Sequence, residues 1–236
     1  STSPNDIAPK LFIPSKEGSL QLEMVSATRQ FGFLPYSDRG TLSSIMSLVK
    51  DDIPVIVFQN LSIQLLPQWH YAVVIGFDSD KGTVTLHTGL TPNHEMSLEL
   101  FERTWGRGNY WYLAPVPPNV TSPEMTPFTY VSAAYDMLKV GDKARSLAFL
   151  ETASHTWPTY WLSYFLVANY YLEQNDNQAV AWFEKGYEVG QHQHVYVHNY
   201  VLALRENNMP EKANTILKQG LERFPNNEPL LTLAEK

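Results

Sequence analysis

The spacing of apolar residues along the chain changes between residues 115 and 127. Before about residue 115, two patterns alternate: apolar positions three or four residues apart, as in helices, and short β-branched runs, as in strands. From Pro127 onward the apolar positions keep helical spacing throughout. The pattern therefore predicts an α+β region followed by an all-α region.

The first region is expected to contain three helices and four strands. Ser19, Thr41 and Ser97 can each cap a helix, because their hydroxyl oxygens can accept a hydrogen bond from a free backbone N–H. The turn Asp80-Lys81-Gly82 predicts a hairpin between the two middle strands. The expected helices span residues 20–31, 42–50 and 98–105, and the expected strands span residues 55–58, 70–78, 83–87 and 110–113.

Between the two regions the chain is rich in proline. Five prolines occur in the fourteen residues from Ala114 to Pro127. Proline lacks a backbone N–H and breaks helices and inner strands. We therefore expect domains at residues 1–115 and 128–236, joined by a stiff linker at 116–127.

The second region repeats itself. Small residues recur at offsets of 33 and 34, at Ser146, Ala179 and Ala213. A second small set (Ala153, Gly186 and Gly220) and the larger residues between them (Leu150, Phe183 and Leu217) keep the same offsets. This period is typical of tetratricopeptide repeats. We expect repeats at about 128–158, 160–192 and 194–226, followed by a capping helix, with a concave face that binds a peptide or protein. The alternative is that they only pack on the first region.

Composition narrows the function. The net charge is −7 with no lysine or arginine cluster, which argues against a nucleic-acid partner. The chain contains no run of 18 apolar residues, so no membrane-spanning helix is predicted. No phosphate-loop, dinucleotide or zinc-protease motif occurs, so no cofactor is expected. His192, His194 and His198 lack a nearby carboxylate, and we interpret them as an exposed turn and helix face rather than a metal site.

The strongest candidate for chemistry is His70, at the start of the apolar run Tyr71–Phe77. A general base requires a rigid support and an exposed tip, and a strand start provides both. The alternative is a structural histidine. Gln59 and Asn60, at the end of the preceding strand, could support the site by hydrogen bonds or could simply begin a polar loop.

Residues from about Ile13 to Leu113 resemble the C39-type peptidases, the papain-like domains that process bacteriocin leaders. The segments that carry the resemblance are Gly18–Leu20, Pro54–Val57, His70–Asp78 and Met96–Trp105. Together with the helical repeats, the chain resembles a bacterial group that joins such a domain to C-terminal tetratricopeptide repeats. The fold class implied is an α+β papain-like (C39-like) domain followed by an all-α tetratricopeptide-repeat solenoid.

The resemblance implies thiol-dependent peptide hydrolysis, with His70 at the position of the family's catalytic histidine. The family's nucleophilic cysteine lies in a Cys-Gly-Pro segment upstream of Gly18, and this chain contains no cysteine. Thr88 stands where the family has the orienting aspartate, and Asn93, Glu95 and Asp78 are alternative orienting groups. We therefore expect this chain to be inactive as a peptidase.

Two functions remain open at this point. One is a C39-like cysteine peptidase family protein whose repeats bind a peptide or protein. The other is a non-catalytic adaptor that binds a protein partner through its repeats. The resemblance also implies a bacterial, periplasmic or otherwise extracytoplasmic location. Without the family's cysteine-bearing helix, apolar surface near the His70 strand is expected to be exposed and to favour self-association.

Overall fold

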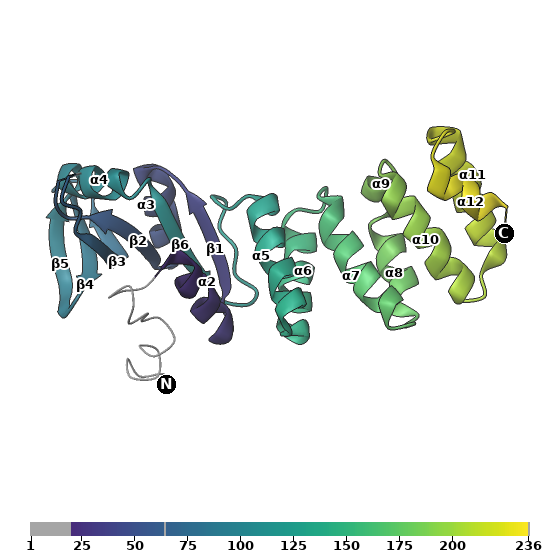
Figure 1. Cartoon of the computed structure of the whole chain (residues 1–236), viewed down its shortest axis with the longest axis horizontal. Coiled ribbons are helices and arrows are strands. Elements are labelled where there is room, and N and C mark those ends of the chain that lie inside the picture. The colour runs from purple at the N-terminus through teal and green to yellow at the C-terminus, as the bar shows by residue number, and fades with distance from the viewer. Residues whose placement is uncertain (1–19, 64, 236) are drawn as a thin grey trace. The chain divides into compact units, whose positions relative to one another are not determined.

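The computed structural model describes residues 20–63 and 65–235 of the chain (Figure 1). Within these residues the chain forms eleven helices and six strands. It divides into two compact units, Ser1–Ala133 and Ala134–Lys236, and the boundary lies inside helix α5 (Pro127–Val140).

The first unit is built on one antiparallel sheet. Its six strands lie in the order β1-β6-β2-β3-β4-β5. Four of them match the predicted strands, whereas β1 and β5 were not predicted. The strands are β1 (Leu34–Arg39), β2 (Val55–Asn60), β3 (Trp69–Asp78), β4 (Thr83–Thr88), β5 (Thr91–Ser97) and β6 (Trp111–Val116).

The predicted hairpin between β3 and β4 is confirmed. Asp78 closes the turn by accepting hydrogen bonds from the backbone N–H groups of Asp80 and Lys81, both at 3.0 Å. Gly82 follows with a φ of 65°, a conformation that glycine adopts without strain. The side chain of Asp78 therefore serves the turn, at the end of β3 opposite to His70.

Three helices accompany the sheet: α2 (Gln21–Gln30), α3 (Leu42–Lys50) and α4 (Leu98–Arg107). Two predicted caps are confirmed. The Thr41 hydroxyl accepts from the Ser44 N–H at 3.2 Å, and the Ser97 hydroxyl accepts from the Leu100 N–H at 3.3 Å. Ser19 lies outside the described residues. The caps fix where α3 and α4 begin, and so which of their faces meet the core.

The core of the first unit lies between the sheet and its helices. Val55 and Val57 of β2 are fully buried, as the alternation along a strand requires. Helix α4 packs against β2 with the buried side chains of Phe101 and Trp105. The Trp105 indole N–H donates to the carbonyl of Trp111 at 2.8 Å, which ties the helix to β6.

The proline-rich segment belongs to the first unit. The Ser122 hydroxyl donates to the Asp51 carboxylate at 2.5 Å, and the Tyr36 hydroxyl accepts from the Thr126 N–H at 3.0 Å. Met125 is buried. Side chains of the first unit thus hold the segment that was predicted to be a stiff linker, and the chain divides later, at Ala133 and Ala134.

The described part of the second unit is helical, and Figure 1 shows its helices packed beside one another. Helices α6 to α9 each pack on the next, as do α10 to α12, most closely α7 with α8 and α10 with α11. The helices after α5 are α6 (Lys143–Thr156), α7 (Trp161–Glu173), α8 (Gln178–Lys185), α9 (Tyr187–Gly190), α10 (His194–Glu206), α11 (Pro210–Arg223) and α12 (Glu228–Ala234).

Close approach of helices explains the repeated small residues. A Cβ atom at Gly186 would lie 2.5 Å from the Cβ of Tyr164, and one at Gly220 would lie 2.6 Å from a methyl carbon of Val197. Ala179 and Ala213 are completely buried. The small positions are therefore where one helix rests directly on the next.

The fold class drawn from the resemblance is wrong as stated. The described residues form a mixed α+β chain with eleven helices and a six-stranded antiparallel sheet, and not a clear papain-like domain followed by an all-α tetratricopeptide-repeat solenoid. Helix α5 is shared between the two units. In the expected repeat at 160–192, the second helix is divided at Gly186 into α8 and α9. The small–large–small spacing indicates where helices pack closely. Close packing is a local property, and it does not determine the overall architecture.

A membrane-spanning helix is not found in the described residues, since none of their helices is both long and apolar enough.

Candidate functional site

The pairing of three strands places His70 beside Thr88. In the register of β2 and β3, Gln59 lies opposite His70, and in that of β3 and β4, Ala72 lies opposite Thr88. The Nε2 atom of His70 and the hydroxyl oxygen of Thr88 are 2.7 Å apart, within hydrogen-bond distance. The two residues that the resemblance placed in one site are thus in direct contact.

Burial lowers the pKa of His70 below its ordinary value of 6.5, because a partly buried imidazole loses hydration of its charged form. The imidazole is therefore neutral at pH 7. When Nε2 carries the proton and donates to Thr88, Nδ1 is left as an acceptor. None of the described residues forms a hydrogen bond with Nδ1. The ring is thus held at one nitrogen and open at the other.

Gln59 and Asn60 are buried, but neither side chain forms a hydrogen bond with the His70 imidazole. The Gln59 amide donates to the Thr104 hydroxyl of α4 at 2.8 Å. The Asn60 side-chain oxygen accepts from the N–H groups of Ser62 at 3.0 Å and Gln68 at 2.9 Å. Gln59 therefore joins β2 to α4, and Asn60 closes the base of the β2–β3 loop just before His70.

The alternative orienting residues form no hydrogen bond with His70. Asp78 lies at the far end of β3, in the turn to β4. Glu95 of β5 pairs with Thr85, and the backbone N–H of Asn93 donates to Nδ1 of His87 at 3.2 Å. Thr88 is thus the candidate that contacts the imidazole.

A neutral imidazole beside a hydroxyl can accept a proton but holds the resulting charge poorly. A carboxylate at the Thr88 position would stabilise the imidazolium, and a hydroxyl provides only a dipole. The chain contains no cysteine to act as a nucleophile. The arrangement supplies a positioned proton acceptor and lacks the partner that would make it catalytic.

The same end of the sheet carries exposed apolar side chains that the sequence analysis did not single out. Leu65 is 88% exposed, Leu66 is 72% exposed and Leu90 is fully exposed. A signal for them exists in the sequence: no Asp, Glu, Lys or Arg occurs from Ile53 to Phe77. The two strands expected in that run, at 55–58 and 70–78, leave a loop between them, and the exposure of its leucines was not predicted.

A groove in the second unit is the other candidate site. It has a volume of about 530 Å³ and lies among α5, α7 and α10. Its lining combines aliphatic, aromatic, amide and charged side chains: Tyr135, Leu138, Lys139, Lys143, Phe165, Leu166, Asn169, Tyr170, Leu172, Glu173, Gln174, Asn199 and Leu202. The sequence predicted a binding face in this region but did not identify these residues.

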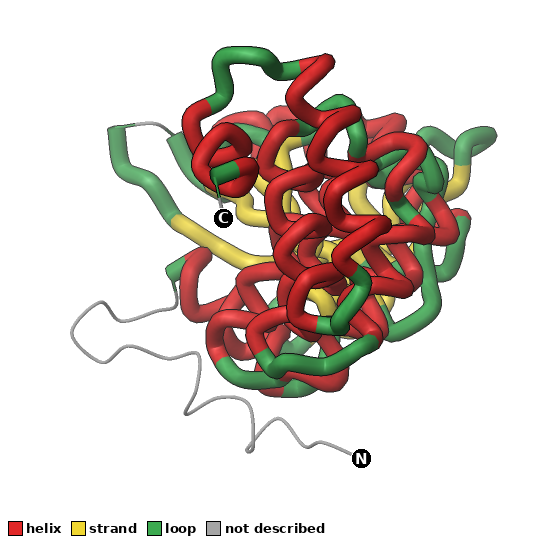
Figure 2. The backbone as a smooth tube through the Cα atoms, turned by 90° about the vertical axis from the view of Figure 1, so that its right-hand side faces the viewer, coloured by secondary structure: helices red, strands yellow, loops and turns green. Residues whose placement is uncertain are grey.

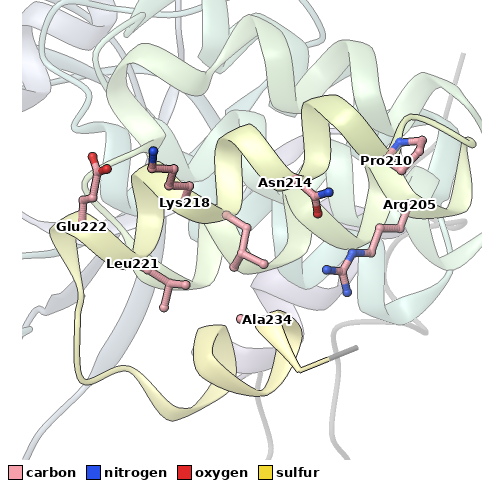
Figure 3. A pocket seen from close by; sticks show the side chains of 8 residues that line it. Arg205, Pro210, Asn214, Lys218, Leu221, Glu222 and Ala234 are labelled. Carbon is pink, nitrogen blue, oxygen red and sulfur yellow. The ribbon is translucent and has the colours of Figure 1, made fainter.

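A larger hollow of about 850 Å³ lies beside α11 and α12 (Figure 3). One of its charged groups already has a structural partner, because the Arg205 guanidinium donates to the Leu233 carbonyl near the end of α12 at 2.8 Å. Lys218 and Glu222 lie one turn apart on α11. This hollow therefore lacks a set of polar groups that converge on one point.

No group of three or more metal-ligating side chains occurs in the described residues. Of the three clustered histidines, His194 packs edge-on against Phe224 at 6.1 Å, and Nδ1 of His198 lies 2.8 Å from the side-chain oxygen of Asn199. These two side chains are engaged in contacts within the helical unit.

Comparison of the chain with known protein families finds no family whose model matches it, and comparison with curated proteins finds no match either.

Proposed function

We propose that the protein binds a peptide segment in the groove among α5, α7 and α10. The observation that carries this proposal is the groove itself, a hollow of about 530 Å³ whose lining residues all belong to the second unit. Sites for small ligands and short segments are concave, mostly apolar, and contain a few polar groups that fix orientation. The lining of this groove has that composition.

The amides in the groove suit a peptide backbone. The Asn199 side-chain N–H donates to the Asn169 side-chain oxygen at 2.7 Å, and this bond fixes the orientation of both amides. Because the Asn169 oxygen accepts this bond, its amide nitrogen remains as a donor for a peptide carbonyl in the proposed complex. Tyr135 and Phe165 supply flat apolar surface for side chains of the peptide.

The charges in the groove favour an acidic residue in the peptide. Lys139 and Lys143 line the groove together with a single carboxylate, that of Glu173. The Lys139 ammonium lies 4.3 Å from the centre of the Tyr135 ring, and that of Lys143 lies 5.9 Å from the centre of Tyr170. Both cations are thus held over the aromatic walls.

Selection from a displayed library of random decapeptides tests this function. We expect the intact chain to enrich peptides with an acidic residue beside apolar residues. The double variant Lys139→Glu, Lys143→Glu should lose affinity for the enriched peptides at least tenfold. The control is Lys218→Glu, which makes the same substitution at the hollow beside α12, away from the groove. This variant should bind the peptides normally. Failure of the intact chain to enrich any sequence would refute peptide binding by the groove.

A second candidate function rests on His70. Its anchored Nε2 and open Nδ1 suit a base that accepts a proton from a thiol, and the peptide bound by the helical unit is the corresponding substrate class. We propose that His70 is the base half of a thiol-dependent peptidase site. The chain itself, which contains no cysteine, has no peptidase activity in this proposal.

This second function is tested on a longer form of the protein that carries an upstream cysteine. A thiol-directed alkylating agent should label that cysteine at pH 7, and His70→Ala should slow the labelling at least tenfold. His87→Ala is the control, because His87 lies on the neighbouring strand and bonds to Asn93. Equal labelling rates in the three proteins would show that His70 does not activate a thiol.

A further inference from the structure

The loop between β2 and β3 carries four exposed aliphatic side chains, which we call the apolar tip: Leu61, Ile63, Leu65 and Leu66. Their exposed fractions are 40%, 59%, 88% and 72%. Figure 2 shows this loop extending beyond the strands that it connects. Single exposed aliphatic residues are ordinary on a protein surface, but four on one short loop form a patch that requires an explanation.

The base of the loop is fixed although its tip is exposed. The N–H of Leu61 donates to the carbonyl of Gln68 at 2.9 Å, and Asn60 accepts the two backbone hydrogen bonds described above. The Arg107 guanidinium donates to the Ser62 carbonyl at 2.7 Å. These hydrogen bonds fix the base of the loop, on either side of the exposed leucines.

Two further apolar side chains extend the patch at the same end of the sheet. Trp69 is 51% exposed and stacks on Phe58, with 4.9 Å between ring centres and 9° between ring planes. Leu90 is fully exposed on the β4–β5 turn. The pairing of Ala72 with Thr88 brings that turn beside the start of β3.

Two arginines lie at the end of the sheet that carries the apolar tip. They are Arg39, which pairs with Trp111, and Arg107, which ends α4, and both are exposed. The carboxylate at this end is that of Asp38, next to Arg39. Cations beside the apolar patch complement an anionic surface.

We propose that this end of the sheet docks on the surface of a phospholipid bilayer. The apolar tip enters the boundary between headgroups and acyl chains, Trp69 lies at headgroup depth, and Arg39 and Arg107 face lipid phosphates. The absence of formally charged residues from Ile53 to Phe77 matters here, because a charge on the inserting loop would oppose entry into the hydrocarbon.

The shape of the patch distinguishes a bilayer from a peptide partner. A peptide or small ligand is bound in a concavity whose walls partly bury the lining residues. Leu65, Leu66 and Leu90 are instead almost free of protein contact, which is the geometry of a protrusion. A protrusion gains contact on all its sides by entering lipid.

Vesicle flotation of the intact chain tests the proposal. We expect the chain to float with vesicles of phosphatidylcholine containing 30% phosphatidylglycerol, and to bind pure phosphatidylcholine more weakly. Leu65→Asp, Leu66→Asp should reduce the bound fraction at least tenfold. Leu22→Asp is the matched control, since Leu22 is a leucine of similar exposure (76%) on α2, and this variant should float like the unmodified chain.

Three results would overturn the proposal. The unmodified chain could fail to float with either vesicle, or the Leu65→Asp, Leu66→Asp variant could float as well as the unmodified chain. The third is that Leu22→Asp reduces the bound fraction as much as the double variant does. Sedimentation of the same proteins without lipid identifies a competing occupant. A dimer that dissociates in the Leu65→Asp, Leu66→Asp variant would show that the patch binds a second copy of the chain. Near-ultraviolet circular dichroism checks that each variant remains folded.

Discussion

The two units hold their candidate sites by different means. In the sheet unit, the orientation of His70 depends on one hydrogen bond of 2.7 Å to Thr88, at the end of a sheet whose register brings the two together. In the helical unit, the helices that carry the groove are packed through small residues such as Gly186 and Ala179, which let neighbouring helices approach closely. The first site should therefore respond to changes of charge and hydrogen bonding, and the second to changes of volume.

The largest expected effect is on the packing of the helical unit. Phe183 is fully buried and stacks on Tyr200 with 5.6 Å between ring centres. Phe183→Ala should lower the free energy of unfolding by about 3–5 kcal/mol, because a large cavity replaces the ring. Urea unfolding with hydrogen exchange of the α8 and α10 amides measures it. Phe128→Ala, at a phenylalanine that is 68% exposed, is the control and should cost little.

A change that adds volume should also destabilise the helical unit. In most helices a Gly→Ala change is neutral or stabilising. At Gly186 the new methyl group would meet the Cβ of Tyr164 and the hydroxyl of Tyr196, both at 2.5 Å. Gly186→Ala should therefore cost about 1–3 kcal/mol, measured by thermal unfolding. An increase in the stability of Gly186→Ala would contradict the close packing at this position. It would also contradict the expectation that the helical unit responds to changes of side-chain volume.

In the sheet unit a comparable change acts through a hydrogen bond. Gln59→Leu keeps most of the side-chain volume but removes the donor to Thr104. The Thr104 hydroxyl retains its bonds to the carbonyls of Leu100 and Phe101. We therefore expect Gln59→Leu to lower the free energy of unfolding, measured in urea, by only about 1 kcal/mol. Gln68→Leu, at an exposed position of the loop, is the control, and a loss as large as that of Phe183→Ala would contradict this assignment.

The smallest expected effect is the pH dependence due to His70. The folded-state pKa of His70 is lowered by burial, so the unfolded chain binds the proton more readily. The contribution of His70 to the free energy of unfolding is therefore fully present above the unfolded-state pKa of about 6.5. It is lost as the pH falls through the folded-state pKa. The unmodified chain should therefore lose more stability on acidification than His70→Gln does. Unfolding midpoints at pH 7.5 and 5.5 measure the difference.

Thr88→Asp should reverse this behaviour, because a carboxylate next to the ring favours the imidazolium. The pKa of His70 should therefore rise above its value in the unmodified chain. Titration of the His70 imidazole signals by NMR measures the shift. An unchanged titration of His70 would show that Thr88 does not set its electrostatic environment.

The elements that the sequence predicts well are those with strong local signals. Thr41 and Ser97 mark helix starts through their caps, and the Asp80-Lys81-Gly82 turn marks the hairpin. Strands β1 and β5 were missed because their sequences, LPYSDR and TPNHEMS, lack an apolar run. They are strands because neighbouring strands supply backbone partners, which is tertiary information.

The candidate sites were predictable to different degrees. The 18-residue separation of His70 and Thr88 follows from a hairpin, so a local pattern together with the resemblance was enough to suggest their proximity. The pairing of Asn169 with Asn199 links two helices 30 residues apart. Which faces of α7 and α10 meet depends on helix rotation, and the sequence pattern fixes that rotation only coarsely.

The attachment of the proline-rich segment to the first unit has a practical consequence for dissecting the protein. A cut at residue 115 would remove Met125 from its buried position and the Thr126 partner of the Tyr36 hydroxyl. The isolated sheet unit would then be a damaged fragment, and its behaviour would misrepresent the intact chain. Gene fusions and protease-site insertions that treat residues 116–127 as a neutral spacer would disturb the unit they are meant to leave intact.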